Sequence, residues 1–144
     1  MGLVVKQILL VLIIAWLLSG CAKKNNNVPF LGREDVVRSF FALIDEKRIP
    51  EAVEMMSNRI VSNENAKQEW AVQFNDFDSI KVINVEKSIE ENLFKVTLEV
   101  RVNQRAENYP IPYYGYSNKS DVRFIKLVKN SQGLWKIDGI GTGP

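Results

Sequence analysis

The hydrophobic positions between residues 33 and 74 follow a helical period. Within residues 33–46 the apolar side chains gather on one face, which is formed by Val36, Val37, Phe40, Phe41 and Ile44. This spacing is typical of an amphipathic helix whose apolar face is buried. A second helix is predicted over residues 50–57, because its first residue is a proline. A third is predicted over residues 64–74, with Ser62 or Asn63 as its N-cap.

After residue 78 the period shortens to two, which is the spacing of half-buried strands. Residues 80–85 predict a first, less regular strand. Residues 92–103 predict a second, because one face carries only Phe94, Val96, Leu98, Val100 and Val102. Residues 121–129 are apolar on both faces, which indicates a central strand. The turn residues 130–133 lead into a last strand, 134–140, with Trp135 and Ile137 on its buried face.

Helices first and antiparallel strands afterwards predict an α+β fold, in which N-terminal helices pack on a curved, mainly antiparallel sheet of about four strands. We expect one domain over residues 33–144. The order of its elements, ending in Gly133-Leu134-Trp135-Lys136-Ile137, resembles the nuclear transport factor two-like, cystatin-like superfamily. That resemblance implies a cone in which the helices close over the sheet. The long connection over residues 104–120 departs from the regular hairpins of the superfamily.

The first twenty residues carry a different pattern. Lys6 precedes eleven consecutive apolar residues, 8–18, and the small residues Ser19 and Gly20 follow them. A helix of that length rises about 16 Å, roughly half the hydrocarbon core of a bilayer, so it is too short for a permanent span. A basic start, a short apolar stretch and small residues at its end are typical of a secretory signal peptide.

The only cysteine of the chain follows directly, in the order Leu18-Ser19-Gly20-Cys21. This order resembles a bacterial lipobox, which implies cleavage between Gly20 and Cys21 and acylation of the Cys21 thiol, with palmitate as the expected label. The chain then divides into a cleaved signal peptide (1–20), a lipidated cysteine with a flexible tether (21–32) and the domain. The resemblance implies a lipoprotein of the bacterial cell envelope that faces away from the cytoplasm. The alternative is a buried cysteine behind an uncleaved anchor helix.

The composition excludes several kinds of chemistry. The chain has no histidine and a single cysteine, which excludes metal sites built on imidazole or paired thiolates and also Ser-His or Cys-His nucleophile pairs. Its 19 basic and 17 acidic side chains give a net charge of +2, which is too small for a nucleic-acid binder. We therefore expect no metal, no cofactor and no nucleic-acid partner.

Enzymes of the superfamily place a carboxylate inside the cone as a general base, so an isomerase-like or lyase-like activity is the alternative to a binding function. The inner positions assigned from the alternation, such as Phe94, Leu98 and Ile137, are all apolar. Asp76 and Asp78 are the carboxylates nearest the expected mouth of the cone, but turn formation also explains them. We therefore assign no catalytic residue and expect a non-catalytic binding domain.

All four tyrosines of the chain lie in one segment, at Tyr109, Tyr113, Tyr114 and Tyr116, together with two prolines. Tyrosine offers a large rigid face and a polar tip, which suits contacts with a ligand or protein. We expect these rings either to form a binding surface or to cover the open end of the cone. The expected partners are thus the membrane and a protein or small molecule, and a homodimer is a variant favoured by the two-sided strand 121–129.

Overall fold

The computed structural model describes residues 31–103 and 119–144, and the structural statements below concern those residues alone. Three helices come first: α2 (Arg33–Asp45), α3 (Ile49–Glu54) and α4 (Glu64–Asn75). Four strands follow: β1 (Phe77–Lys87), β2 (Leu93–Val102), β3 (Lys119–Lys129) and β4 (Trp135–Gly141). The predicted order of helices and strands is confirmed. The main difference in length is at β1, which extends beyond the predicted residues 80–85 at both ends.

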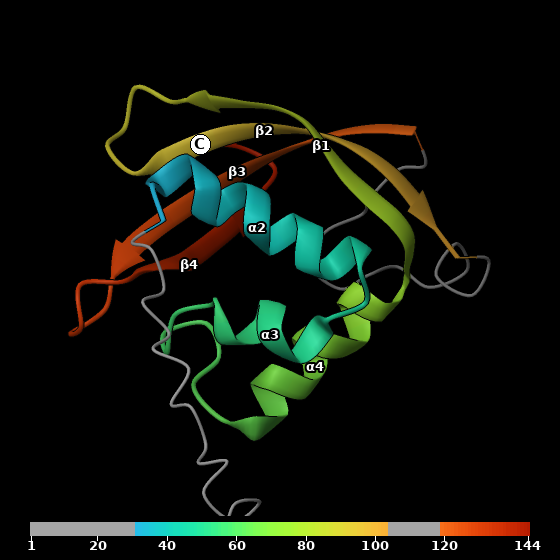
Figure 1. Ribbon diagram of the computed structural model, residues 1–144, viewed down its shortest axis with the longest axis horizontal. Helices are drawn as coiled ribbons and strands as arrows, with labels where there is room; N and C mark the ends of the chain where they lie inside the picture. The colour runs from blue at the N-terminus through green and yellow to red at the C-terminus, as the bar shows by residue number, and fades with distance from the viewer. Residues whose placement is uncertain (1–30, 104–118) are drawn as a thin grey trace, which may run out of the picture.

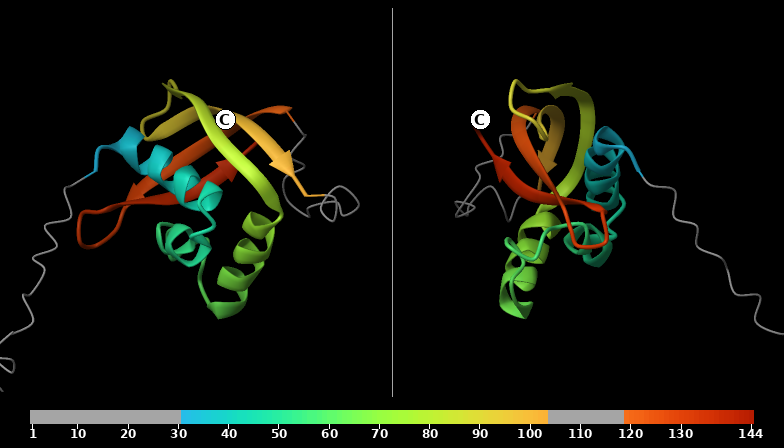
Figure 2. Two further views of the ribbon diagram at one scale, coloured as in Figure 1. Left: turned by 45° about the vertical axis from the view of Figure 1, so that its right-hand side comes forward. Right: turned by 90° about the vertical axis from the view of Figure 1, so that its left-hand side faces the viewer.

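The strands form one antiparallel sheet in the order β1-β2-β3-β4. The sheet is curved, and all three helices lie on one side of it (Figures 1 and 2). Strand β3 lies between β2 and β4, so the prediction of a central strand is confirmed. The predicted α+β fold with helices on a curved antiparallel sheet is confirmed as well.

The core lies between the helices and the inner face of the sheet. On β1 and β2 the inward residues pair apolar with apolar: Phe77 with Val102, Ile80 with Val100, Val82 with Leu98 and Val85 with Val96. The apolar face of α2 packs against them, and all five of its predicted residues are buried. Phe40 is fully buried and makes edge-to-face contacts with Phe41 and Phe74, at centroid distances of 5.2 and 5.5 Å.

Two bulges explain why β1 alternates less cleanly than β2. Val82 pairs with Leu98 and Asn84 with Thr97, so Ile83 is an extra residue that no residue of β2 opposes. A second irregularity makes Asp78 the extra residue in the same way. Each bulge shifts the phase of the alternation by one, which keeps the apolar residues before and after it on the inner face. Ile83 itself is 58% exposed.

The end of α2 covers part of the outer edge of β1. The helix closes with Lys47 at φ 62°, the Lys47 amide donating to the Ile44 carbonyl and the Arg48 amide to that of Leu43. Asp45 Oδ1 then accepts from the Ile80 amide at 2.9 Å, and Lys47 Nζ donates to the Phe77 carbonyl. These bonds satisfy backbone groups of an edge strand that would otherwise be open to pairing.

Trp135 is less buried than the alternation of β4 predicts. It pairs with Lys129 and packs against the core, but only Ile137 of the two predicted inward residues is fully buried. Trp135 begins the strand beside the β3–β4 turn, where the inner face ends. Its ring also lies 4.9 Å from the Lys129 ammonium and 5.6 Å from the Arg33 guanidinium, so cations contact the part of the ring that the core leaves open.

Candidate functional site

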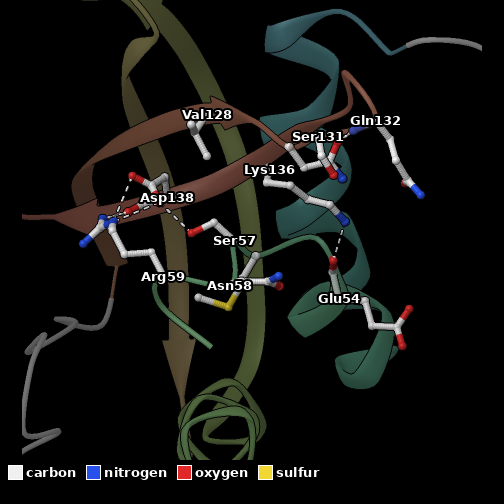
Figure 3. Close-up of a pocket in the computed structure, with 11 residues that line it drawn as sticks. Glu54, Ser57, Asn58, Arg59, Val128, Ser131, Gln132, Lys136 and Asp138 are labelled. Carbon is white, nitrogen blue, oxygen red and sulfur yellow. Dashed lines mark hydrogen bonds and ion pairs between the residues drawn. The ribbon is translucent and has the colours of Figure 1, made fainter. Parts of the chain in front are cut away.

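A groove of about 610 Å³ lies where the segment after α3 meets the β3–β4 hairpin (Figure 3). One wall is made by residues 54 and 56–59, and the other by residues 128–138. Val128 and Met56 contribute apolar surface, whereas most of the other lining side chains are charged or polar. Because the carbon atoms of these long side chains also line it, the groove is suited to a ligand with both polar and apolar parts.

Backbone pairing with β4 fixes the first wall in place. Met56 forms a parallel bridge with Ile137. The Ser57 amide donates to the Ile137 carbonyl at 2.8 Å, and the Ile137 amide donates to the Met55 carbonyl at 2.9 Å. This short segment thus covers the edge of β4 at Ile137 and holds the two walls at a fixed separation.

Asp138 joins the two walls through its side chain. Leu127 pairs with Ile137 and Lys126 with Gly139, so Asp138 is the extra residue of a bulge in β4. Its carboxylate accepts from Ser57 Oγ at 2.6 Å and from Arg59 Nε at 3.0 and 3.1 Å, and Arg59 Nη2 also donates to the Asp138 carbonyl (Figure 3).

These contacts decide the charge state of Asp138. Burial opposes ionisation, but the hydrogen bonds from Arg59 and Ser57 outweigh it and hold the pKa of Asp138 below its ordinary value. The same bond raises the pKa of Arg59. A carboxylate that ionises so readily is a poor proton acceptor near neutral pH. The geometry therefore suits Asp138 to holding the wall segment, and not to general base catalysis.

The remaining polar groups of the groove are more available to a ligand. Lys136 Nζ donates to the Glu54 carbonyl at 2.7 Å, and within residues 31–103 and 119–144 it forms no ion pair. The Asn130 side chain is used inside the turn, where it accepts from the amides of Gln132 and Leu134. In the same part of the chain, the side chains of Asn58 and Gln132 make no hydrogen bond. Two amides and an ammonium group therefore face the groove with donors to spare.

A buried ion pair adds two charged residues to the inner face of the sheet, beside the apolar positions that the alternation assigned to it. Arg123 is opposite Val96 and Asp121 opposite Leu98, and Arg123 is only 2% exposed. Arg123 Nη1 donates to Asp121 Oδ1 at 2.6 Å and to the Val122 carbonyl at 2.9 Å. Asp121 is thus a carboxylate on the inner face, and its bond to Arg123 is the arrangement of a buried structural ion pair.

The alternation of β3 already contains a signal for this pair, which the prediction of a two-sided apolar strand did not use. Ile125 and Leu127 are buried on the inner face of β3, and residues 121 and 123 have the same parity. Because residues 121–129 carry apolar side chains on both faces, that pattern alone does not show on which face Asp121 and Arg123 lie. The groove had no comparable signal, because its two walls are distant in sequence and no periodic pattern joins the polar residues that line it.

The residues singled out from the sequence alone fall mostly outside the described part of the chain. Gly20 and Cys21, and likewise Tyr109, Tyr113, Tyr114 and Tyr116, lie in residues 1–30 and 104–118, so the predictions made for them stay predictions. Asp76 follows α4 as its C-cap, with its carbonyl accepting from the Asn103 amide at 2.9 Å, and Asp78 is the exposed bulge residue of β1. Asp76 fits the turn interpretation, whereas Asp78 does not, because it lies within β1.

Residues 31–103 and 119–144 contain neither a cluster of three acidic or thiol side chains able to hold a metal nor a helix long and apolar enough to cross a membrane. No protein-family model matches the chain, and a search of curated proteins found no match either.

Proposed function

We propose that the chain is a lipid-anchored protein of a bacterial cell envelope, whose domain binds a ligand or protein partner without catalysing a reaction on it. The observation that carries the anchor is the order Leu18-Ser19-Gly20-Cys21 directly after eleven apolar residues. Because Cys21 is the only cysteine, it has no thiol partner within the chain. Each buried CH₂ of an acyl chain contributes about 0.8 kcal/mol, so two or more chains give stable membrane attachment.

Two surfaces support a binding role for the domain. The groove offers the Lys136 ammonium and the amide donors of Asn58 and Gln132, and Val128 contributes apolar surface to its lining. Such a set favours a ligand rich in carbonyl or hydroxyl oxygens, for example a peptide or a sugar. The tyrosine segment, defined by Tyr109, Tyr113, Tyr114 and Tyr116, is the second candidate surface.

The anchor is tested by Cys21→Ser. Cells that make the wild-type chain are expected to incorporate radiolabelled palmitate into it, and the variant is expected to incorporate none and to accumulate as the longer precursor. Palmitate incorporation into the Cys21→Ser chain would contradict the proposal. Ser19→Ala serves as a control, because a small residue is kept beside the cleavage point.

The binding role is tested by photo-crosslinking in intact cell envelopes. A crosslinker placed at Gln132 or at Tyr114 is expected to trap one defined partner, whereas a crosslinker at the exposed Val72 of α4 is expected to trap none. The triple replacement of Tyr113, Tyr114 and Tyr116 by serine separates binding from covering. If the three rings form a binding surface, the triple variant loses the partner and its free energy of unfolding changes by less than about 0.5 kcal/mol. If they cover the core, the free energy of unfolding falls by several kcal/mol.

A further inference from the structure

One end of the domain carries exposed apolar side chains from three separate elements. Leu31 precedes α2 and is 38% exposed. Ile89 lies in the β1–β2 turn and is fully exposed, and Leu134 ends the β3–β4 turn and is 37% exposed. The start of α2 and the two turns lie on the same side of the molecule in two views (Figures 1 and 2). We call this surface, defined by Leu31, Ile89 and Leu134, the tether end.

Hydrogen bonds and ring contacts hold the tether end together. Arg33 Nη1, at the start of α2, donates to Asn92 Oδ1 of the β1–β2 turn at 2.7 Å. The Asn92 carbonyl accepts from the Leu127 amide of β3 at 2.8 Å, and the Arg33 guanidinium also lies over the Trp135 ring of β4. The three apolar positions are therefore presented on one fixed frame.

The β1–β2 turn itself is closed, although its tip is apolar. The Ser88 amide donates to the Leu93 carbonyl at 2.9 Å, and the Leu93 amide donates to the Glu90 carbonyl at 3.3 Å. Asn92 takes a φ of 63°, which an asparagine tolerates in a tight turn. The turn thus holds Ile89 at its tip, where no other part of the described domain shields it from solvent.

The length of chain before Leu31 indicates what this end faces. Nine residues, 22–30, separate Cys21 from Leu31. Fully extended, a chain of that length spans at most about 35 Å. An acyl anchor on Cys21 therefore keeps the point where the chain enters the domain within that distance of the bilayer, and at a high effective concentration beside it.

We propose that the tether end contacts the lipid bilayer, with Ile89 and Leu134 entering the interfacial region and Trp135 behind them at headgroup level. This inference rests on the lipid anchor proposed above. The charges of these segments nearly balance, since Arg33, Lys87 and Lys129 are offset by Glu34, Asp35, Glu90 and Glu91, and Arg33 lies 3.9 Å from Glu91. The contact is therefore driven by apolar side chains and does not require anionic lipids.

The test uses the mature, acylated protein in lipid vesicles. Because acylation consumes the thiol of Cys21, Ile89→Cys introduces the one free thiol of the processed chain, to which a fluorophore is attached. Val72→Cys is the matched control, since Val72 is 58% exposed on α4, away from the tether end (Figures 1 and 2). Fluorescence is measured with a spin-labelled lipid as the membrane quencher and with iodide as the aqueous one.

The probe at residue 89 is expected to lose its fluorescence to the spin-labelled lipid and to be protected from iodide, equally in phosphatidylcholine vesicles and in vesicles containing phosphatidylglycerol. The probe at residue 72 is expected to show the opposite. Equal iodide quenching at both positions overturns the inference. So does a probe at residue 89 that is shielded from iodide but not quenched by lipid, because protein or a second copy then covers this end. Palmitate labelling of the same sample separates a failed contact from a missing anchor.

Discussion

Asp138 is the residue on which the geometry of the groove depends most. Its carboxylate bonds Ser57 and Arg59 of the opposite wall, and its side chain is largely buried, whereas that of Arg59 is 68% exposed. An ion pair with one exposed partner is expected to contribute about 0.2–1 kcal/mol. The hydrogen bond to Ser57 adds to this, because losing it leaves the hydroxyl of a buried serine without its partner.

The first prediction concerns the pH dependence of stability at Asp138. A carboxyl whose pKa is lowered by folding stabilises the folded state above its unfolded pKa, here 3.8, and loses that contribution as the pH falls through the lower folded value. Asp138→Asn is therefore expected to cost about 1 kcal/mol at neutral pH and progressively less below that unfolded pKa. Chemical unfolding at a series of pH values measures the difference.

Glu69→Gln is the matched control for this prediction, because Glu69 is exposed on α4 and forms no ion pair with the described residues. Its effect on stability is expected to be small at every pH. A cost of Asp138→Asn that stays constant down to strongly acidic pH would show that the charge of Asp138 does not hold the wall.

The second prediction concerns Phe40. It is completely buried in the core and contacts the rings of Phe41 and Phe74, so Phe40→Ala is expected to destabilise the fold by about 3–5 kcal/mol, through lost burial and the cavity left behind. That is a large share of the roughly 5–15 kcal/mol that stabilises a typical domain. Val72→Ala, at an exposed position, is expected to change stability by less than about 0.5 kcal/mol. Equal melting temperatures for the two variants would contradict the assigned core.

At the scale of elements, α4 begins at a single identifiable cap. Asn63 Oδ1 accepts from the Ala66 amide at 2.9 Å, which decides between the two caps that the sequence allowed. Asn63→Ala is expected to cost about 1 kcal/mol, since the amide loses its acceptor. Ser62→Ala is the matched control and is expected to be nearly neutral. Thermal melts of both variants test this, and a larger loss for the Ser62 variant would place the cap one residue earlier.

Sequence patterns predict the buried face of a regular strand but not that of a strand with a bulge. The strict alternation of β2 predicted its buried face correctly, because every inward residue there is apolar and no bulge interrupts it. In β1 and β4, extra residues at Ile83 and Asp138 shift the phase, and a pattern of period two has no means of placing such a shift. The bulge at Asp138 is also what brings its carboxylate to the groove, so the candidate site could not have been predicted.

Arg123 shows a second reason for such failures. Its parity with Ile125 and Leu127 placed it on the inner face, but a buried arginine is rare unless a partner is at hand. The partner, Asp121, is only two residues away on the same face. A sequence pattern therefore predicts a buried Arg123 only if it also takes account of Asp121 as the partner on the same face.

In the whole molecule, the tether end and the groove share the β3–β4 hairpin. The hairpin contributes Leu134 to the tether end and Gln132 to the groove, so a ligand in the groove would lie close to the surface that we propose to face the membrane. The proposed partner would then be met near the bilayer surface, and a short tether would favour that encounter by keeping the domain there.

We propose above that Cys21 becomes the acylated first residue of the mature protein. Mass spectrometry of the N-terminal peptide from the membrane-extracted chain tests it directly. We predict a peptide that begins at Cys21 and carries a diacylglyceryl group on its sulfur. A peptide that runs unbroken through Gly20 and Cys21 with a free thiol would contradict the account.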